Sequence, residues 1–364
     1  MKTKLFLFVT VLFFLNSCKT NQKTTTIKTI KSLRFIGEQI LPANLFFKNT
    51  KVGGLSSIDY ANGKYYLISD DKDKPIRFYE MNLNFDSNNF SDIKITNVTT
   101  ILTNKNVDPE SLRFDKNTNH FIWTSEGSIR KGVNPSVFEI KPNGTFIKEY
   151  KIPDLFKIST NKTVGPRHNG TFEGLTLTKN NIWLAMELPL KQDGEEPKLA
   201  KGKYPVRISK IDKKTSELQF QFAYLLDAIP RDSKPSGKFM VNGLPEFLNI
   251  DNNQFLVIER AYASGHKDGG NDVKIYKVDG NNATDIKQIK ALKNATYIPA
   301  KKKLLFDFET IRSKLTNQII DNIEGITFGP KLKNGNRTLI VVSDNNFNKF
   351  SKQLNQFIVF EVIE

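Results

Sequence analysis

Short runs of apolar and aromatic residues recur along this chain, separated by stretches rich in Asn, Gly and Asp. Five of the strongest runs end in an acidic residue, and they lie at residues 65–70, 121–126, 182–187, 255–259 and 339–344. β-branched and aromatic residues in runs of this length, with turn residues between them, are typical of strands. The pattern therefore predicts an all-β fold.

A short motif precedes four of these runs and indicates an internal repeat. It consists of Glu, one further residue, and Leu or Ile, and it occurs at residues 110–112, 173–175, 246–248 and 324–326. The first copy, at residues 53–56, has the same character but lacks the Glu. A third strand follows every run, and a weaker fourth strand follows in copies one to four. Four strands per repeat favour a single β-propeller.

The repeat length indicates the number of blades. Leu55 and Ile326 are four periods and 271 residues apart, which gives about 68 residues per blade. We therefore favour five blades. Six remain possible, because long insertions near residues 150–172, 188–206 and 291–323 could hold a degenerate blade. A pair of β-sandwiches is a further alternative, but it does not predict five similar hairpins.

The ends of the chain predict how the ring closes. The fifth copy reaches the C-terminus after its third strand, so its blade lacks a fourth strand. Residues 32–41 have the pattern of a fourth strand. We expect this N-terminal strand to pair with the last blade and close the propeller.

The first eighteen residues have the pattern of an export signal. Lys2 and Lys4 form a basic start, and the apolar run at residues 5–15 is shorter than the roughly 20 residues that span a bilayer. Residues 15–18 resemble a bacterial lipobox, which implies cleavage before Cys18 and lipidation of its thiol. We predict a lipoprotein signal peptide at 1–17, a flexible tether at 18–30 and the propeller domain at 31–364.

This interpretation places the protein outside the cytoplasm. We expect an exported lipoprotein held by the lipid on Cys18 at the periplasmic face of the outer membrane or at the cell surface. An ordinary cleaved signal peptide with an incidental Cys is the alternative. Removal of residues 1–17 takes away two Lys and lowers the formal charge from +16 to +14.

The charge itself says little about partners. The chain of 364 residues has 54 Lys and Arg against 38 Asp and Glu, but the Lys are spread along its whole length. This distribution is typical of a solvated surface, and no basic helix or nucleic-acid-binding motif accompanies it, so we expect no nucleic-acid partner. The single Cys excludes a disulfide framework and a Cys-based zinc site. We expect a monomer.

The acidic residues of the repeat are the candidate chemistry. In an antiparallel hairpin the start of one strand lies beside the end of the next, so the motif Glu and the acid that ends the following run share one rim. The predicted ring consists of Asp70, Asp71, Glu110, Glu126, Glu173, Glu187, Glu246, Glu259, Glu324 and Asp344. Carboxylates so close together raise one another's pKa, and Ca²⁺ is the kind of hard cation that would offset their repulsion.

The residues of the ring could also be stabilised without a metal. The Glu side chains could accept hydrogen bonds from backbone N–H groups of neighbouring blades, which is a structural role. Arg113, Arg167 and Arg260 lie next to the motifs and could supply positive charge. The sequence leaves both possibilities open.

The same segments resemble a known family. Residues 108–114, 167–175, 258–260, 321–330 and 342–347 are similar in order and character to the phytase-like family described as having esterase-like activity. The resemblance implies an exported bacterial β-propeller that hydrolyses phosphomonoesters, with Ca²⁺ by analogy with propeller phytases. The first copy departs from the pattern, so a fully symmetric site is not expected.

The resemblance also implies roles for the site residues. Ca²⁺ on the rim would bind a small phosphorylated substrate and activate water. Glu110, Glu173 and Glu324 are the candidate catalytic residues, and a rim Glu without metal could act as general base. Arg167, Arg260, Asn169 and Arg113 would bind the substrate. The candidate metal ligands are Asp70, Asp71, Glu126, Glu187, Glu246, Glu259 and Asp344.

Two rival functions remain. A serine hydrolase would need a nucleophile elbow of the Gly-x-Ser-x-Gly type, which the sequence lacks, although His168 could serve a convergent triad. The second rival is a non-catalytic, lipid-anchored propeller that binds a ligand or partner and holds a structural metal. Phosphatase assays with and without Ca²⁺ separate these functions.

Overall fold

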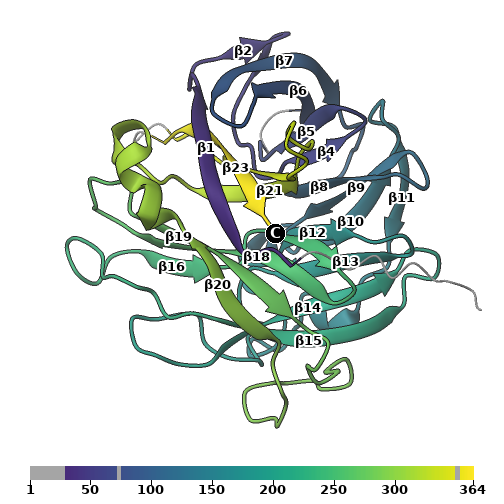
Figure 1. The fold of residues 1–364 in the computed structure, drawn as a ribbon. Coiled ribbons are helices and arrows are strands. Elements are labelled where there is room, and N and C mark those ends of the chain that lie inside the picture. The colour runs from purple at the N-terminus through teal and green to yellow at the C-terminus, as the bar shows by residue number, and fades with distance from the viewer. Residues whose placement is uncertain (1–28, 72–74, 349–352) are drawn as a thin grey trace, which may run out of the picture.

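The structure is a computed structural model that describes residues 29–71, 75–348 and 353–364. Five antiparallel sheets are arranged as blades around one central channel (Figure 1). Blade 1 consists of β4 (Asp59–Ala61), β5 (Lys64–Ser69), β6 (Arg77–Phe85) and β7 (Phe90–Thr100). Blade 2 consists of β8 (Pro109–Asp115), β9 (His120–Ser125), β10 (Ser136–Ile140) and β11 (Phe146–Tyr150).

The next two blades follow in chain order. Blade 3 consists of β12 (Phe172–Leu177), β13 (Asn181–Met186), β14 (Tyr204–Asp212) and β15 (Leu218–Leu226). Blade 4 consists of β17 (Phe247–Asp251), β18 (Gln254–Ala263), β19 (Asn271–Asp279) and β20 (Lys301–Asp307). An additional strand, β16 (Met240–Gly243), pairs with the C-terminal part of β18, so blade 4 has five strands.

Blade 5 joins the two ends of the chain. It consists of β21 (Ile323–Phe328), β22 (Thr338–Ser343), β23 (Asn355–Ile363) and the N-terminal strand β1 (Ser32–Leu41), which pairs antiparallel with β23. This confirms the expected closing strand and the five-bladed ring (Figure 1). Ile30, at the end of the expected tether, is already buried against the domain.

Long insertions near residues 150–172, 188–206 and 291–323 could have held a sixth blade. Among the described residues they contain no additional sheet. They contain short 3₁₀ segments instead, such as η2 (Asp154–Phe156), η3 (Phe308–Lys314) and η4 (Thr316–Gln318), and residues 301–307 supply the fourth strand of blade 4. The other short elements are the hairpin of β2 (Phe46–Phe47) and β3 (Thr50–Lys51), and η1 (Ile129–Lys131).

The core lies between blades, which explains the apolar runs of the sequence. In β5, Tyr65 and Leu67 pack into the cluster shared with blade 5, whereas Tyr66 and Ile68 pack into the cluster shared with blade 2. A strand buried on both faces reads as a continuous apolar run rather than as an alternation. The aromatic side chains fill these layers, as in the pair of Trp183 and Phe255, whose ring centroids are 4.9 Å apart.

The predicted export signal lies outside the described residues. Cys18 and most of the predicted tether belong to residues 1–28, of which the structure gives no account. Within the described residues, no helix has the length and apolar character needed to cross a bilayer.

Candidate functional site

A large cleft of about 1900 Å³ opens at one end of the channel, and we call it the mouth cleft. Acidic side chains from four blades line it. Eight of the ten predicted ring acids are among its lining residues: Asp70, Asp71, Glu110, Glu126, Glu173, Glu187, Glu324 and Asp344. The structure therefore brings most of the predicted ring together, and it leaves Glu246 and Glu259 elsewhere.

One repeated backbone contact positions these acids. The N–H of Glu126 donates to the carbonyl of Asp108 at 2.9 Å, which places Glu126 beside the strand that carries Glu110. Blades 3 and 5 repeat this arrangement, because the N–H groups of Glu187 and Asp344 donate to the carbonyls of Thr171 and Asn322. In each blade the acid that follows the second strand thus lies beside the start of the innermost strand, as the antiparallel hairpin requires.

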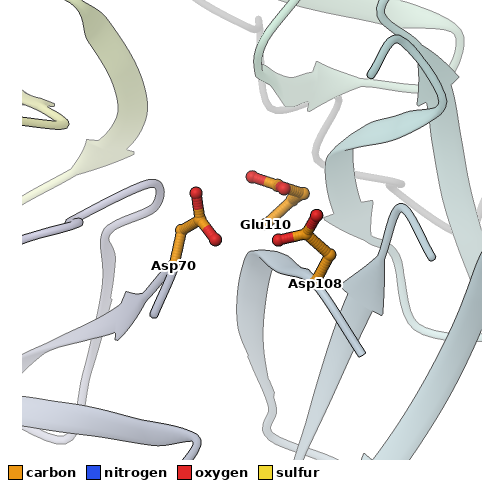
Figure 2. Close-up of side chains that lie close together, drawn as sticks. All are labelled: Asp70, Asp108 and Glu110. Carbon is orange, nitrogen blue, oxygen red and sulfur yellow. The ribbon is translucent and has the colours of Figure 1, made fainter. Parts of the chain in front are cut away.

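The acids of blades 1 to 3 form two overlapping groups. Carboxylate oxygens of Asp70, Asp108 and Glu110 lie within 4.8 Å of one another, and Figure 2 shows the three side chains converging. Glu110, Glu126 and Glu173 form a second group that meets the same limit. Glu110 belongs to both groups and lies at their centre.

Sequence reasoning missed two acids of this region. Asp108 stands two residues before Glu110, and alternation along a strand puts such a pair on one face, so the signal was present in the sequence. Asp321 lines the mouth cleft and accepts the N–H groups of Asn322 and Leu354. Burial raises the pKa of Asp321 to about 6.

Glu110 and Glu173 are the least compensated acids of the cleft. Their exposed fractions are 7% and 8%, and among the described residues neither carboxylate accepts a hydrogen bond or forms an ion pair. Burial first, and then the neighbouring carboxylates, raise the pKa of both groups well above the ordinary value of 4.5. A buried charge without a partner is costly, so each carboxyl retains its proton more strongly or needs a cation.

On the far side of the cleft, Glu187 and Glu324 pair with the guanidinium of Arg260. Nη2 of the half-buried Arg260 lies 3.3 Å from an oxygen of Glu187 and 3.3 Å from an oxygen of Glu324. Among the described residues, its buried Nε has no hydrogen-bond partner. Burial raises the pKa of Asp344 to about 7, although Arg260 opposes the shift. Arg260 therefore brings positive charge to the wall of the cleft, although its Nε is enclosed by protein atoms.

Strand alternation explains why Arg260, and not Glu259, reaches the mouth cleft. Glu259 lies on the same face of β18 as Val257, and that face packs against blade 3. There its carboxylate accepts from the Tyr224 hydroxyl and the Asp227 N–H and pairs with Lys302. The metal role predicted for Glu259 at the rim thus has no geometric basis, because the next residue occupies the position of the acid.

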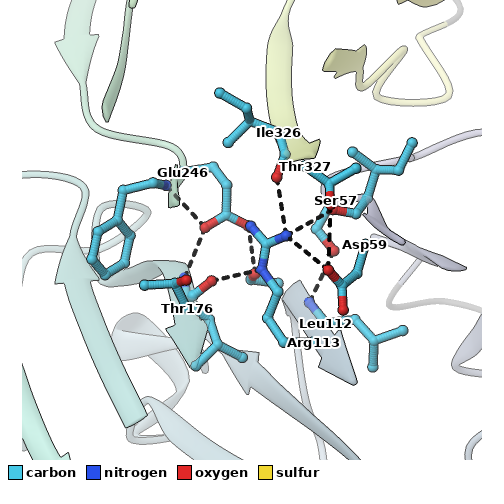
Figure 3. Close-up of polar contacts among 12 residues, drawn as sticks. Ser57, Asp59, Leu112, Arg113, Thr176, Glu246, Ile326 and Thr327 are labelled. Carbon is cyan, nitrogen blue, oxygen red and sulfur yellow. Dashed lines mark hydrogen bonds and ion pairs between the residues drawn. The ribbon is translucent and has the colours of Figure 1, made fainter. Parts of the chain in front are cut away.

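Glu246 and Arg113 lie together outside the mouth cleft. Arg113 Nη2 is 2.9 Å from Glu246 Oε2, and the same carboxylate accepts from the N–H groups of Leu175 and Phe247 (Figure 3). The Arg113 guanidinium also donates to the carbonyls of Ile58, Leu175 and Ile326. We call this cluster the Arg113 hub.

The Arg113 hub connects every blade. Arg113 comes from blade 2, and its partners Ile58, Leu175, Glu246 and Ile326 come from blades 1, 3, 4 and 5. Burial raises the pKa of Glu246 to about 7, and Arg113 and the hydrogen bonds oppose this shift. The structure therefore gives these two residues the structural role that the sequence left open, away from the predicted metal and substrate positions.

Of the remaining candidate residues, some line the mouth cleft and others have a structural role. Arg167 donates to the carbonyls of Pro189 and Gly194 and pairs with Glu196, so its guanidinium holds a loop and does not line the cleft. Asn169 does line the cleft and is exposed there, as is His168. Asp71 lines the cleft but pairs with the buried Arg77 at 3.1 Å.

A comparison of the sequence with family models bears on the chemistry of this cleft. A model described as phytase-like, with esterase-like activity of phytase, matches residues 50–347. The chain belongs to this phytase-like family. The match includes the four motif Glu residues and Arg260, and the described activity is hydrolytic. No curated protein sequence matches this chain.

Solved structures show a similar backbone at low sequence identity. The catalytic domain of a GH62 α-L-arabinofuranosidase from Coprinopsis cinerea has a TM-score of 0.46 and 10% identity over 92% of this chain and 98% of that chain. An α-L-arabinofuranosidase from Lactobacillus brevis has a TM-score of 0.45 and 11% identity over 88% and 92%. A xylan β-1,4-xylosidase from Bacillus halodurans has a TM-score of 0.44 and 9% identity, and the match spans 85% of this chain and 53% of that one.

Proposed function

We propose that this phytase-like propeller is a metal-dependent phosphoric ester hydrolase, with Ca²⁺ as the metal, and that the mouth cleft is its active site. One observation carries the proposal: Glu110 and Glu173 are buried carboxylates without hydrogen-bond or ion-pair partners among the described residues, within two groups of converging acids. Apolar or amide side chains would fold there at lower cost, and a bound cation would offset the cost of burying these two carboxylates.

The donor set fits Ca²⁺. The groups contain carboxylate oxygens only, which are hard ligands, and their side chains come from three blades: Asp70, Asp108, Glu110, Glu126 and Glu173. Ca²⁺ takes six to eight oxygen ligands, so waters or substrate oxygens would complete the shell. A bound ion would polarise the phosphoryl group and lower the pKa of a coordinated water.

The chain's own residues supply the rest of the site. Arg260 lines the cleft and would attract the substrate phosphate through the charge of its guanidinium, while Glu187 and Glu324 hold that group in place. Glu324 lies outside both acidic groups, and burial and then Asp344 raise its pKa. A raised pKa favours the protonated carboxyl, so we assign Glu324 as the candidate general acid that would protonate a leaving alkoxide.

The test is a phosphatase assay on 4-nitrophenyl phosphate and on phytate, in Ca²⁺ and in a chelator. We expect Ca²⁺-dependent turnover that Glu173→Gln lowers at least about 100-fold, since such a loss is typical when transition-state charge stabilisation is removed. Glu196→Gln is the matched control. Glu196 lines the same cleft but lies outside both acidic groups, with its side chain 53% exposed.

Two outcomes would contradict the proposal. If no ester is hydrolysed in any condition while Ca²⁺ still raises the melting temperature, the hydrolase proposal is wrong and the metal is structural in a binding propeller. If Glu173→Gln and Glu196→Gln behave alike, the mouth acids are not the site of the chemistry.

We also propose the lipid anchor and export that residues 1–18 predict, with the protein acting as a monomer. Expressed in a bacterial host, the full chain should fractionate with membranes and incorporate labelled palmitate. Cys18→Ser should abolish the label. Label retained in the Cys18→Ser variant would exclude this anchor, and a dimer in gel filtration of residues 19–364 would exclude the monomer.

A further inference from the structure

Blade 4 differs from the other blades where it borders the mouth cleft. Its second strand supplies Arg260 in the position where blades 1, 2, 3 and 5 supply an acid, and only this sheet carries an additional strand, β16, among the described residues. Besides the two acids that pair with Arg260, the cleft is lined on this blade by four apolar or aromatic residues: Phe239, Met240, Val241 and Tyr262. We call these four residues the blade 4 wall.

We propose that the blade 4 wall is the leaving-group subsite of the enzyme and selects phosphoric esters of flat, aromatic alcohols. The inference rests on the proposed function, because it takes the phosphate to be bound at Arg260. It adds a substrate class that the acidic residues alone do not define.

The strand geometry aligns the two parts of such a substrate. Arg260 and Tyr262 are two residues apart on β18 and both line the cleft, so they share one face of the strand. Two residues of a strand span about 6.6 Å. That separation is close to the distance between the phosphorus atom and the far side of a phenyl ring in an aryl phosphate. A phosphate at Arg260 therefore places an aromatic leaving group along Tyr262.

Phe239 extends this surface toward solvent. Its ring stands 6.0 Å from the Tyr262 ring at an angle of 44°, and its exposed fraction of 66% is the highest of any large apolar side chain among the described residues. Phe46, the next most exposed, also lines the mouth cleft. The two most water-exposed Phe side chains of the described residues thus border the same acidic cleft, where a bound ring would remove them from water.

Phe239 lies on a loop that several hydrogen bonds fix in place. The carbonyl of Phe239 accepts the Ser264 N–H at 3.0 Å, and the Ser233 hydroxyl accepts the Lys238 N–H at 2.8 Å. His266 contacts the carbonyl of Asp232 at 2.7 Å and fixes the start of the loop. The ring is therefore presented by hydrogen-bonded backbone on both sides.

The test compares two esters across variants. We expect Phe239→Ala to lower the ratio of kcat/KM for 1-naphthyl phosphate to that for glycerol 2-phosphate by about two- to tenfold, the range of one aromatic pair. Phe239→Trp, which keeps an aromatic side chain at this position, should have about the same ratio as the wild-type protein. Phe146→Ala is the control, because Phe146 is 44% exposed on β11 and does not line the cleft. An unchanged ratio in Phe239→Ala overturns the proposal.

A binding measurement keeps the two proposals separable. Calorimetric titration with 1-naphthylphosphonate and with methylphosphonate needs no turnover. Tighter binding of the naphthyl compound, lost in Phe239→Ala, supports the subsite even if no ester is hydrolysed and the hydrolase proposal fails. Equal affinities for the two phosphonates overturn the subsite while leaving hydrolysis intact.

Discussion

Glu173 and Glu246 begin equivalent motifs in neighbouring blades, yet their surroundings are opposite. Glu246 lies in the Arg113 hub, where an arginine, two backbone N–H groups and the Ser111 hydroxyl satisfy its carboxylate. Glu173 lies in the mouth cleft, also buried, with no hydrogen bond or ion pair to its carboxylate among the described residues. One motif therefore produces a structural residue in blade 4 and an unsatisfied one in blade 3.

The difference shows how a propeller separates stability from chemistry along its channel. In the Arg113 hub every charge has a partner, and the partners come from all five blades, so the cluster fixes the ring. In the mouth cleft like charges converge, and burial and then the neighbouring carboxylates raise the pKa of Glu110 and Glu173. Residues that destabilise the fold in this way are retained where binding needs them. Three predictions test this comparison.

The largest effect is expected in the hub. Arg113→Met should lower the free energy of unfolding by about 4 kcal/mol, because it leaves the Glu246 charge buried without its partner. The loss also removes the donor to three backbone carbonyls on three other blades. Urea unfolding followed by circular dichroism measures it.

Arg130→Met is the control for this variant. Arg130 is an exposed residue of the mouth cleft, so the same substitution should change the unfolding free energy by less than about 0.5 kcal/mol. Equal stability of the two variants would show that the hub does not hold the blades together.

A second, smaller effect is expected from Ca²⁺ and pH at the mouth cleft. Glu110 and Glu173 have folded pKa values well above their ordinary 4.5, and that of Asp344 rises to about 7. From about pH 4.5 upward through neutral pH, the folded state therefore binds more protons than the unfolded chain. The metal-free protein should lose stability as pH rises through this window.

Ca²⁺ should reverse this trend, because it binds the ionised carboxylates. At 100 times its dissociation constant the ion would stabilise the fold by about 2.7 kcal/mol at pH 8, and by much less at pH 5, where protons compete. Thermal melts at both pH values, with Ca²⁺ or chelator, measure the difference. A Ca²⁺ gain as large at pH 5 as at pH 8 would place the ion away from these acids.

The sequence predicts those features of the fold and the site that recur from blade to blade. Five apolar runs with a shared motif predicted five blades, and the missing fourth strand predicted the closure by residues 32–41. Hairpin geometry predicted a ring of ten acids, and eight of them meet in one cleft. These features follow from periodicity and chain connectivity, which need no knowledge of how blades pack.

The features that the sequence did not predict depend on contacts between blades. Glu259 was assigned to the rim because it ends an apolar run, but β18 continues to Ala263 and the alternation directs Arg260 to the cleft. Glu246 carries the same motif as Glu173, and its partner Arg113 is 133 residues away in the sequence. Only the closed ring brings these two residues together.

The smallest effect is expected for Glu173→Gln, and the matched substitution of Glu246 is its comparison. Glu173→Gln removes a repelling charge and should raise the unfolding free energy of the metal-free protein by about 1 kcal/mol at pH 8. Glu246→Gln, the matched substitution, should lower it by about 3 kcal/mol, since it leaves Arg113 without its anion. At pH 4 the Glu173→Gln gain should nearly vanish, because the wild-type carboxyl is then largely protonated in both states. Urea titrations at pH 4 and pH 8 measure all three proteins. A loss of stability in Glu173→Gln would mean that Glu173, like Glu246, holds the fold together, and the mouth cleft would then differ from the hub in position only.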